Sequence, residues 1–185
     1  MAGLPHYKNS TASMNNFEPL YKSMFEIQII PPPSVGDFKL VIENVKKVTM
    51  EDIYKLPEPV QQKYKFATRT YAGGSFDKTS FEVSISFEVN LNDNNSAYVF
   101  KALRKWTDLI YDPLTGRMGL KKDYIGGPMI ISFFNKNFDI YQQIKCPVVF
   151  PVTPLKAMEG DYSSNEIYVI EDFKFVVDYF EEVII

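Results

Sequence analysis

The clearest pattern in the chain lies between positions 79 and 90, where apolar and polar residues alternate strictly from Phe81 to Asn90. Its apolar positions are Phe81, Val83, Ile85, Phe87 and Val89, and its polar positions are Glu82, Ser84, Ser86, Glu88 and Asn90. A period of two places the two sets on opposite faces of an extended strand, which a helix does not do. The pattern predicts a strand with one face on a core and the other towards water.

Shorter alternating or apolar runs predict the other strands, at residues 21–30, 37–50, 128–135, 138–150 and 167–182. The first is expected to end at three consecutive prolines, which cannot donate to a β ladder. The pair at 128–135 and 138–150 is typical of a hairpin, joined near Asn135 and Asn137.

Three stretches between these runs are predicted to be irregular. The alternation dissolves between residues 51 and 65 around two prolines, which indicates a long excursion. A turn is expected at Gly73 and Gly74, because adjacent glycines tolerate positive φ. Residues 113–127 are expected to form a loop.

The period changes to that of a helix after residue 92. Asp93, Asn94 and Asn95 are good N-caps, and Pro113 ends the pattern. One helical face carries Val99, Ala102, Leu103, Trp106, Leu109 and Ile110, while another carries Lys101, Arg104, Lys105 and Asp108. Together, the strand and helix patterns predict a mainly antiparallel β domain, barrel-like or sandwich-like, with one packed α-helix.

Length and composition favour a single β domain over residues 17–185, preceded by a flexible N-terminal arm at 1–16. The chain has 185 residues, of which 45% are hydrophobic, and a net charge of −3, so it has no global attraction for nucleic acid. One cysteine suits a reducing compartment. Without a membrane-length apolar run or a secretory signal, we expect a soluble cytosolic product.

The chemistry of the side chains argues against an enzyme. The single histidine, His6, lies in the predicted arm, where no positioned base or Cys/His zinc site is expected. Cys146 has the setting of a small buried hydrophobe. Glu82 and Glu88 stand about 20 Å apart along one strand face, whereas a glycosidase pair needs roughly 5 to 9.5 Å. We therefore predict no catalytic residues, no metal site and no cofactor.

Two surfaces have both a functional and an ordinary interpretation. The basic stripe of Lys101, Arg104 and Lys105 is typical of a contact with an acidic partner, and equally of a solvated helix face. The polar face of strand 79–90 is small and acidic and has no Lys or Arg among its members. DNA would slide past such a face without sticking, since phosphate contacts come mainly from Lys and Arg. The outside of an ordinary sheet has the same pattern.

Several marks follow one another in an order that matches a known family. They are the Ala72-Gly73 turn, the strand at 79–90, the polar break at 92–96 and the helix with Trp106. More specific are a Phe150-Pro151 turn, a Ser164-to-Ile167 entry and a closing strand that ends in Asp178-Tyr179-Phe180. From about Phe25 to Phe180 the chain resembles the tail tube protein of T-even-like contractile-tailed phages.

The sequence departs from the family pattern in three places. Phe150 stands where a tryptophan is usual, and the excursion at 51–65 and the loop at 155–163 look longer than in short members. These differences leave the predicted fold unchanged and affect how rings would stack.

The resemblance implies a tail-tube fold whose copies form hexameric rings, stacked into a hollow tube through which DNA leaves the capsid. The polar face of Glu82, Ser84, Ser86, Glu88 and Asn90 then lines the lumen. Candidate contacts between subunits or rings are Tyr54, Leu56, Leu155, Met158, Asp161 and Tyr162, and the basic stripe faces outward. Implied partners are further copies of the chain and the sheath, tube-initiator and tail-terminator proteins of a virion, with no membrane.

Other functions are compatible with the same residues. The inner tube of a phage-derived contractile injection system would pass effectors instead of a genome. A tube-initiator or baseplate relative would share the fold. From a different class, a monomeric β-sandwich binding module commonly has exposed aromatics in a groove, and no sequence pattern singles out such a groove. Assembly into rods or rings would support one of the tube-related functions and argue against the monomeric binding module.

Overall fold

The structure is a computed structural model, which describes residues 20–36, 42–50, 53, 56–74, 80–90 and 98–184. The predicted arm at 1–16, the contact candidate Tyr54 and the three N-cap candidates at 93–95 lie outside the described residues.

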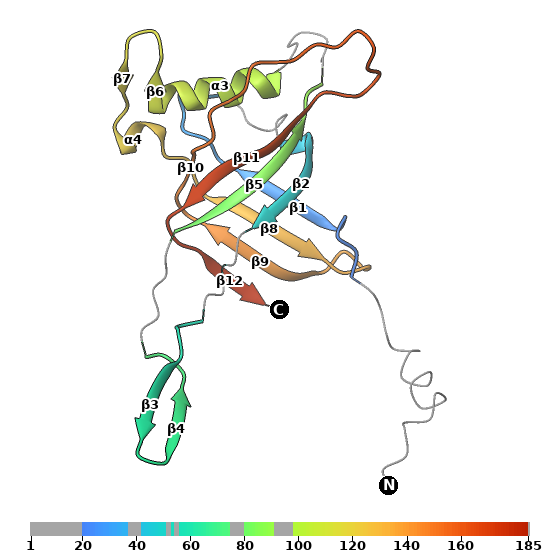
Figure 1. The fold of residues 1–185 in the computed structure, drawn as a ribbon. Coiled ribbons are helices and arrows are strands. Elements are labelled where there is room, and N and C mark those ends of the chain that lie inside the picture. Colours follow the sequence, from blue (N-terminus) through green and yellow to red (C-terminus); the bar gives the residue numbers. More distant parts are fainter. Residues whose placement is uncertain are drawn as a thin grey trace.

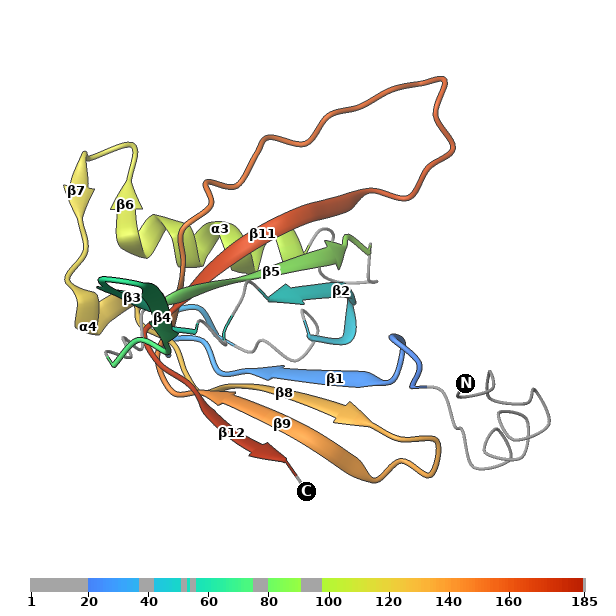
Figure 2. The ribbon, with the colours of Figure 1, turned by 60° about the horizontal axis from the view of Figure 1, so that its bottom comes forward.

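Two four-stranded antiparallel sheets face one another (Figures 1 and 2). The first has the order β1 (Phe25–Ile29), β8 (Met129–Phe134), β9 (Ile140–Cys146) and β12 (Glu181–Ile184). The second has the order β10 (Val149–Pro151), β11 (Val169–Val177), β5 (Phe81–Glu88) and β2 (Val45–Met50). The predicted antiparallel β class is confirmed.

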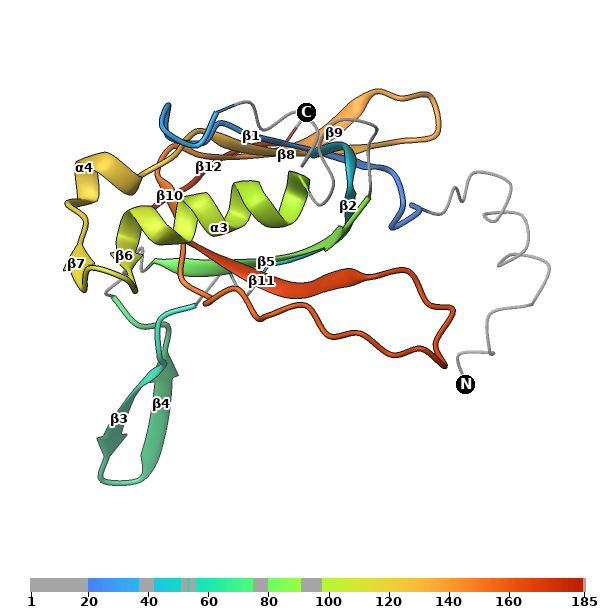
Figure 3. The same ribbon diagram turned by 90° about the horizontal axis from the view of Figure 1, so that it is seen from above.

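The smaller elements lie outside these sheets. They are the hairpin of β3 (Val60–Tyr64) and β4 (Ala67–Tyr71), helix α3 (Tyr98–Ile110), the ribbon of β6 (Tyr111–Asp112) and β7 (Arg117–Met118), and the single turn α4 (Lys121–Tyr124). Viewed from above, α3 runs along the side of both sheets, between β1 and β11 (Figure 3).

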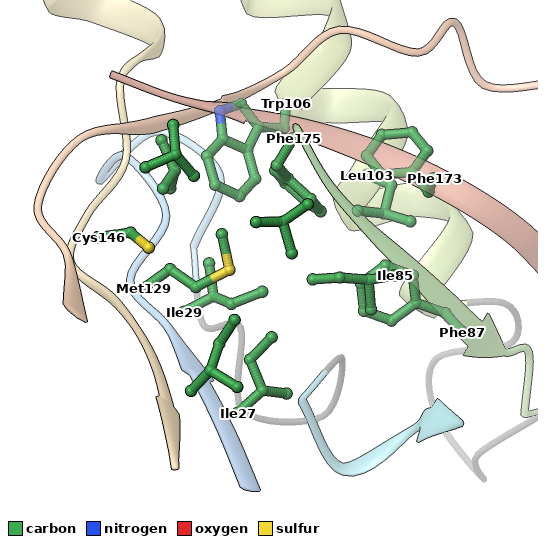
Figure 4. Close-up of a cluster of buried hydrophobic side chains, with 14 of the residues drawn as sticks. Ile27, Ile29, Ile85, Phe87, Leu103, Trp106, Met129, Cys146, Phe173 and Phe175 are labelled. Carbon is green, nitrogen blue, oxygen red and sulfur yellow. The ribbon is translucent and has the colours of Figure 1, made fainter. Parts of the chain in front are cut away.

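The core lies between the sheets and under the helix. Strand β5 buries its predicted apolar residues Phe81, Val83, Ile85 and Phe87. The facing sheet contributes Ile27, Ile29, Met129, Ile131 and Ile144, and the helix contributes Val99, Ala102, Leu103 and Trp106. These side chains form one hydrophobic cluster, part of which is drawn in Figure 4. Full burial of each large one stabilises the fold by about 1.5–3 kcal/mol.

Two strands that the sequence predicts as continuous are divided between the sheets. The run at 138–150 forms β9 in one sheet and β10 in the other, with the break at Pro147 and Val148. The run at 167–182 likewise forms β11 and then β12. Each break carries the chain from one sheet to the other, which periodicity does not reveal because both halves remain extended.

Other expected boundaries were also wrong. The second strand begins at Val45, and the excursion at 51–65 contains strand β3 of a hairpin. The loop at 113–127 includes β7 and α4. Gly73 does not have a positive φ; it is needed because an added Cβ would lie 2.4 Å from the carbonyl oxygen of Glu58.

Candidate assembly surfaces

The polar residues of β5 lie on the face of its sheet that points away from the core. Glu82, Ser84 and Glu88 are half-buried, and Ser86 is buried. The fifth lumen candidate, Asn90, is half-buried and lies beyond the end of β5. The strand therefore has the two faces that its sequence predicts. That this polar face lines a lumen stays a prediction.

Neighbouring strands supply lysines to this face. The Lys174 Nζ of β11 lies 2.6 Å from Glu82 Oε2, and the Lys46 Nζ of β2 lies 3.1 Å from Glu88 Oε2. Lys47 of β2 lies 3.7 Å from Asp172 of β11. The face is acidic on β5 alone, as the sequence indicates, and is balanced in charge once its neighbours are included.

Ser86 is buried beside a bulge in β11. The pairing of β11 with β5 shifts register between Ile170 and Phe173, and Asp172 within the bulge has a φ of 46°. Its backbone N–H donates a 3.2 Å hydrogen bond to Ser86 Oγ. Sequence reasoning missed this bulge, although two consecutive polar residues, Glu171 and Asp172, interrupt the alternating run there.

The β10–β11 loop, residues 152–168, extends well beyond the sheets (Figure 2). Its start is tied to β11, where the N–H of Lys174 donates to Thr153 Oγ1 at 3.1 Å. Leu155 is half-buried and packs against the core, whereas Met158, Asp161 and Tyr162 are exposed. The contact candidates on this loop thus include one anchor and three side chains that face solvent.

Asp161 is ordered by its own turn. The Ser163 hydroxyl and the Ser163 backbone N–H donate to Asp161 Oδ1 at 2.7 and 2.8 Å. These bonds lower the pKa of the Asp161 carboxyl below its ordinary value, the hydroxyl contributing most. The loop tip therefore carries a firmly ionised carboxylate.

The β3–β4 hairpin, residues 58–73, projects from the body of the molecule (Figures 1 and 3). All ten residues of its two strands are exposed, as are Phe66 in its turn and the contact candidate Leu56 before it. Sequence reasoning did not identify this element. The usable signal was its Val, Thr and Tyr content, which is typical of strands.

The basic stripe of α3 is exposed, as expected for an exterior face. Lys101, Arg104 and Lys105 all face solvent. Arg104 Nε lies 2.9 Å from Asp108 Oδ1, one turn later, and Lys105 Nζ donates a 3.5 Å hydrogen bond to the Val35 carbonyl. Part of the stripe is thus already engaged within the chain.

A groove that the sequence does not indicate lies beside this stripe. It has a volume of about 450 Å³ and runs between the end of α3 and strand β10. Its walls include Ile110, Tyr111, Phe150, Pro151 and Leu155. Phe150 and Pro151, which the sequence predicts as a turn, are paired residues of strand β10 and form one side of the groove.

The described residues lack both a cluster of metal ligands and a membrane-spanning helix. Nowhere among them do three His, Cys, Asp or Glu side chains gather closely enough to hold a metal ion. No helix in the described part of the chain is long and apolar enough to cross a membrane. Burial raises the pKa of the Cys146 thiol to about 12, so it is not an activated nucleophile.

Comparison with solved structures places this fold among components of contractile injection systems. A chain of the tube-terminating cap of the anti-feeding prophage superposes with a TM-score of 0.59 at 16% identity, covering 91% of this chain and 93% of that one. A chain of the sheath-tube complex of an extracellular contractile injection system, PVC, in its extended state gives 0.57 at 16% identity, covering 95% and 98%. A chain of the sheath/tube terminator of PVC gives 0.52 at 14% identity, covering 91% and 99%.

No protein-family model and no curated protein matches the sequence. The similarity therefore lies in the fold, which extends over nearly the whole length of each chain. The predicted tail-tube fold is confirmed, and its neighbours are structural components of tail-like assemblies.

Proposed function

We propose that this chain is a non-enzymatic structural protomer of a tail tube. Its copies form hexameric rings that stack into a hollow tube, the conduit through which DNA leaves a phage capsid. The tube belongs to the virion and is assembled in the host cytoplasm. The observation that carries this proposal is the end-to-end match to a chain of a sheath-tube complex, with 95% of one chain and 98% of the other covered.

The exposed elements support self-assembly. The hairpin and the β10–β11 loop expose Tyr64, Phe66 and Tyr162 to solvent, so their rings do not stabilise a single protomer by burial. Each main sheet also ends in edge strands, namely β1 and β12 in one and β10 and β2 in the other. Such edges invite pairing with another chain, and closing strands around a ring covers them.

The polar face of β5 is the proposed lining of the lumen. Its carboxylates repel phosphate, and the lysines beside them are engaged in ion pairs with Glu82 and Glu88. A charge-balanced, hydrogen-bonded wall offers DNA few free cations to bind, which suits passage without sequence-specific contact. The basic stripe of α3 is proposed to meet a surrounding sheath.

Electron microscopy of the purified protein in negative stain tests the proposal. Hollow rods built of six-fold rings are expected at high protein concentration. A uniform monomer at every salt and protein concentration contradicts it, and would favour the monomeric binding module instead.

A tube-terminating cap is a second candidate, because two of the structures described above are tube terminators. A cap presents one face that accepts no further ring. Discrete single rings that never lengthen into rods, under conditions where each ring is stable, would favour the cap over the tube.

A phage tube and an injection-system tube differ in their cargo, which is DNA in the first and effectors in the second. The neighbours come from contractile injection systems, which favours effector passage as the alternative to DNA. A capsid gene beside a sheath gene in the same cluster would support the phage assignment, and a sheath gene without capsid genes would support the injection system.

A further inference from the structure

We propose that the β3–β4 hairpin of one copy binds the β10–β11 loop of the next copy, in a head-to-tail contact between a basic aromatic ribbon and an acidic loop. This inference rests on the proposed function and names the two surfaces that meet.

The hairpin has the chemistry of an unpartnered binding element. Lys63, Lys65 and Arg69 make it basic, with Glu58 as the opposing charge. An isolated two-stranded ribbon is only marginally stable in water. This ribbon also exposes the rings of Tyr64 and Phe66, so a partner that covers them would stabilise it. Its cations lie over these rings, with Lys65 Nζ 5.3 Å from the Phe66 ring and the Arg69 guanidinium 5.7 Å from that of Tyr64. A partner that covers this ribbon must be acidic and must tolerate aromatic rings.

The β10–β11 loop has the complementary charge. Glu159, Asp161 and Glu166 make it acidic, with Lys156 as the opposing charge. Its exposed apolar side chains, Met158, Tyr162 and Ile167, suit the rings of the hairpin. Ser163 holds the Asp161 carboxylate in place through two hydrogen bonds, so part of the acidic surface is preformed.

Five carboxylates elsewhere in the described residues are already paired, whereas Asp123, Glu171 and Glu181 are exposed singly on other elements. Glu82, Glu88, Asp108, Asp172 and Asp178 already have lysine or arginine partners within the chain. In the described part of the protein, Glu159 and Glu166 form no such ion pair. The loop is therefore an acidic surface whose charges are still free to pair.

The arrangement of the two elements requires a second copy. The hairpin and the loop project from opposite ends of the molecule in Figure 1 and point apart again in Figure 3. A contact between two different surfaces of identical subunits is heterologous, and it propagates into rings or stacks rather than closing as a two-fold dimer.

Charge reversal with rescue tests this contact. Lys63→Glu with Lys65→Glu, and separately Glu159→Lys with Glu166→Lys, place like charges opposite one another. Each double variant is expected to raise the protein concentration needed for rods or rings at least about tenfold. The chain that carries all four substitutions is expected to regain assembly, because the opposite charges face each other again.

The control is Lys101→Glu with Lys105→Glu, which makes the same charge change on the α3 stripe and should leave assembly concentrations within about twofold. Far-UV circular dichroism checks that every variant is folded. The proposed contact is wrong if wild-type rods form and the charge reversals do not affect them. It is also wrong if the chain with all four substitutions needs the same protein concentration for assembly as the double variants do. If the wild type itself never assembles, the tube proposal fails first.

Cysteine cross-linking gives a second, direct readout. The native Cys146 is buried, so an engineered thiol is the reactive one. Oxidation of a mixed assembly of Thr68→Cys and Asn165→Cys chains is expected to yield a disulfide-linked dimer of the two variants, because Asn165 is exposed on the same loop and leaves the Asp161–Ser163 turn intact. Assemblies in which the two thiols do not cross-link would show that hairpin and loop lie apart.

Discussion

At the scale of single residues, Trp106 connects the helix, the sheets and the α4 turn. Its ring is fully buried with its centroid 5.4 Å from that of Phe175, and its indole N–H donates a 2.7 Å hydrogen bond to the Tyr124 carbonyl. Gly126 leaves the space that the indole fills, since an added Cβ would lie 2.6 Å from Trp106 Cζ2. The tryptophan of the family pattern is therefore a packing residue in this chain.

Replacing Trp106 by alanine is expected to lower the free energy of unfolding by about 3–5 kcal/mol, because it empties a large buried site and leaves the Tyr124 carbonyl unpaired. Denaturant unfolding monitored by circular dichroism measures this loss. The control Tyr162→Ala removes a fully exposed ring and should change stability by less than about 0.5 kcal/mol. Equal losses in both variants would contradict the packing role.

Cys146 gives a pH-dependent prediction. Burial raises its pKa from 9.0 to about 12, so the folded state holds the thiol proton more tightly than the unfolded state does. The resulting contribution to stability is present below pH 9 and is lost as the pH rises from 9 towards 12. We expect a thiol reagent at pH 8 to label the protein only after denaturation. Rapid labelling of the native protein would show that the thiol is accessible.

At the scale of elements, the hairpin and the β10–β11 loop differ from the strands that anchor them. The sheets and α3 share one core, while the ribbon of β3 and β4 contributes none of its residues to it. Under the proposed contact, stability and assembly reside in different elements, so mutation should separate them.

Replacing residues 58–73 by a short Gly-Ser linker is expected to shift the free energy of unfolding by less than about 1 kcal/mol, since lengthening or shortening a surface loop costs little. The same variant is expected to lose assembly. Unfolding curves and negative-stain images of one preparation measure both effects. Unchanged rod formation would exclude the hairpin from any contact between copies.

At the scale of the whole molecule, the proposed lumen depends on which face of the β5 sheet points inward. Ion pairs with Lys174 and Lys46 keep the Glu82 and Glu88 side of the sheet balanced. Exposed pairs of this kind contribute about 0–1 kcal/mol each, so their main effect is on the charge that a passing polymer meets.

Glu82→Lys combined with Glu88→Lys is expected to leave assembly possible and to make the tube retain DNA, because Lys174 and Lys46 lose their carboxylate partners and two further lysines join them on the same face. Co-sedimentation of assembled tubes with DNA at low salt measures retention, which should fall steeply as salt rises. The control Glu26→Lys with Asp123→Lys makes the same charge change on the other sheet and on α4. If the two carboxylates lie outside the assembled tube, both variants should behave alike.

Local patterns in the sequence were sufficient for several features. The alternation at 79–90 identified β5 and its buried residues, and helical spacing identified the buried face of α3, because both patterns depend only on neighbouring residues. The scarcity of His and Cys argued against common catalytic and metal sites. The order of short motifs along the chain indicated the tail-tube fold.

Only the tertiary structure decided which strands are neighbours. It divided two extended runs between opposite sheets, paired Glu82 with Lys174 across 92 positions of sequence, and turned part of an apparent excursion into an exposed hairpin. Periodicity predicts which face of a strand is apolar. It does not predict the neighbouring strand, which determines the strand order and the net charge of the sheet face. The character of the proposed lumen and the meeting of hairpin and loop therefore depend on contacts between residues far apart in the sequence.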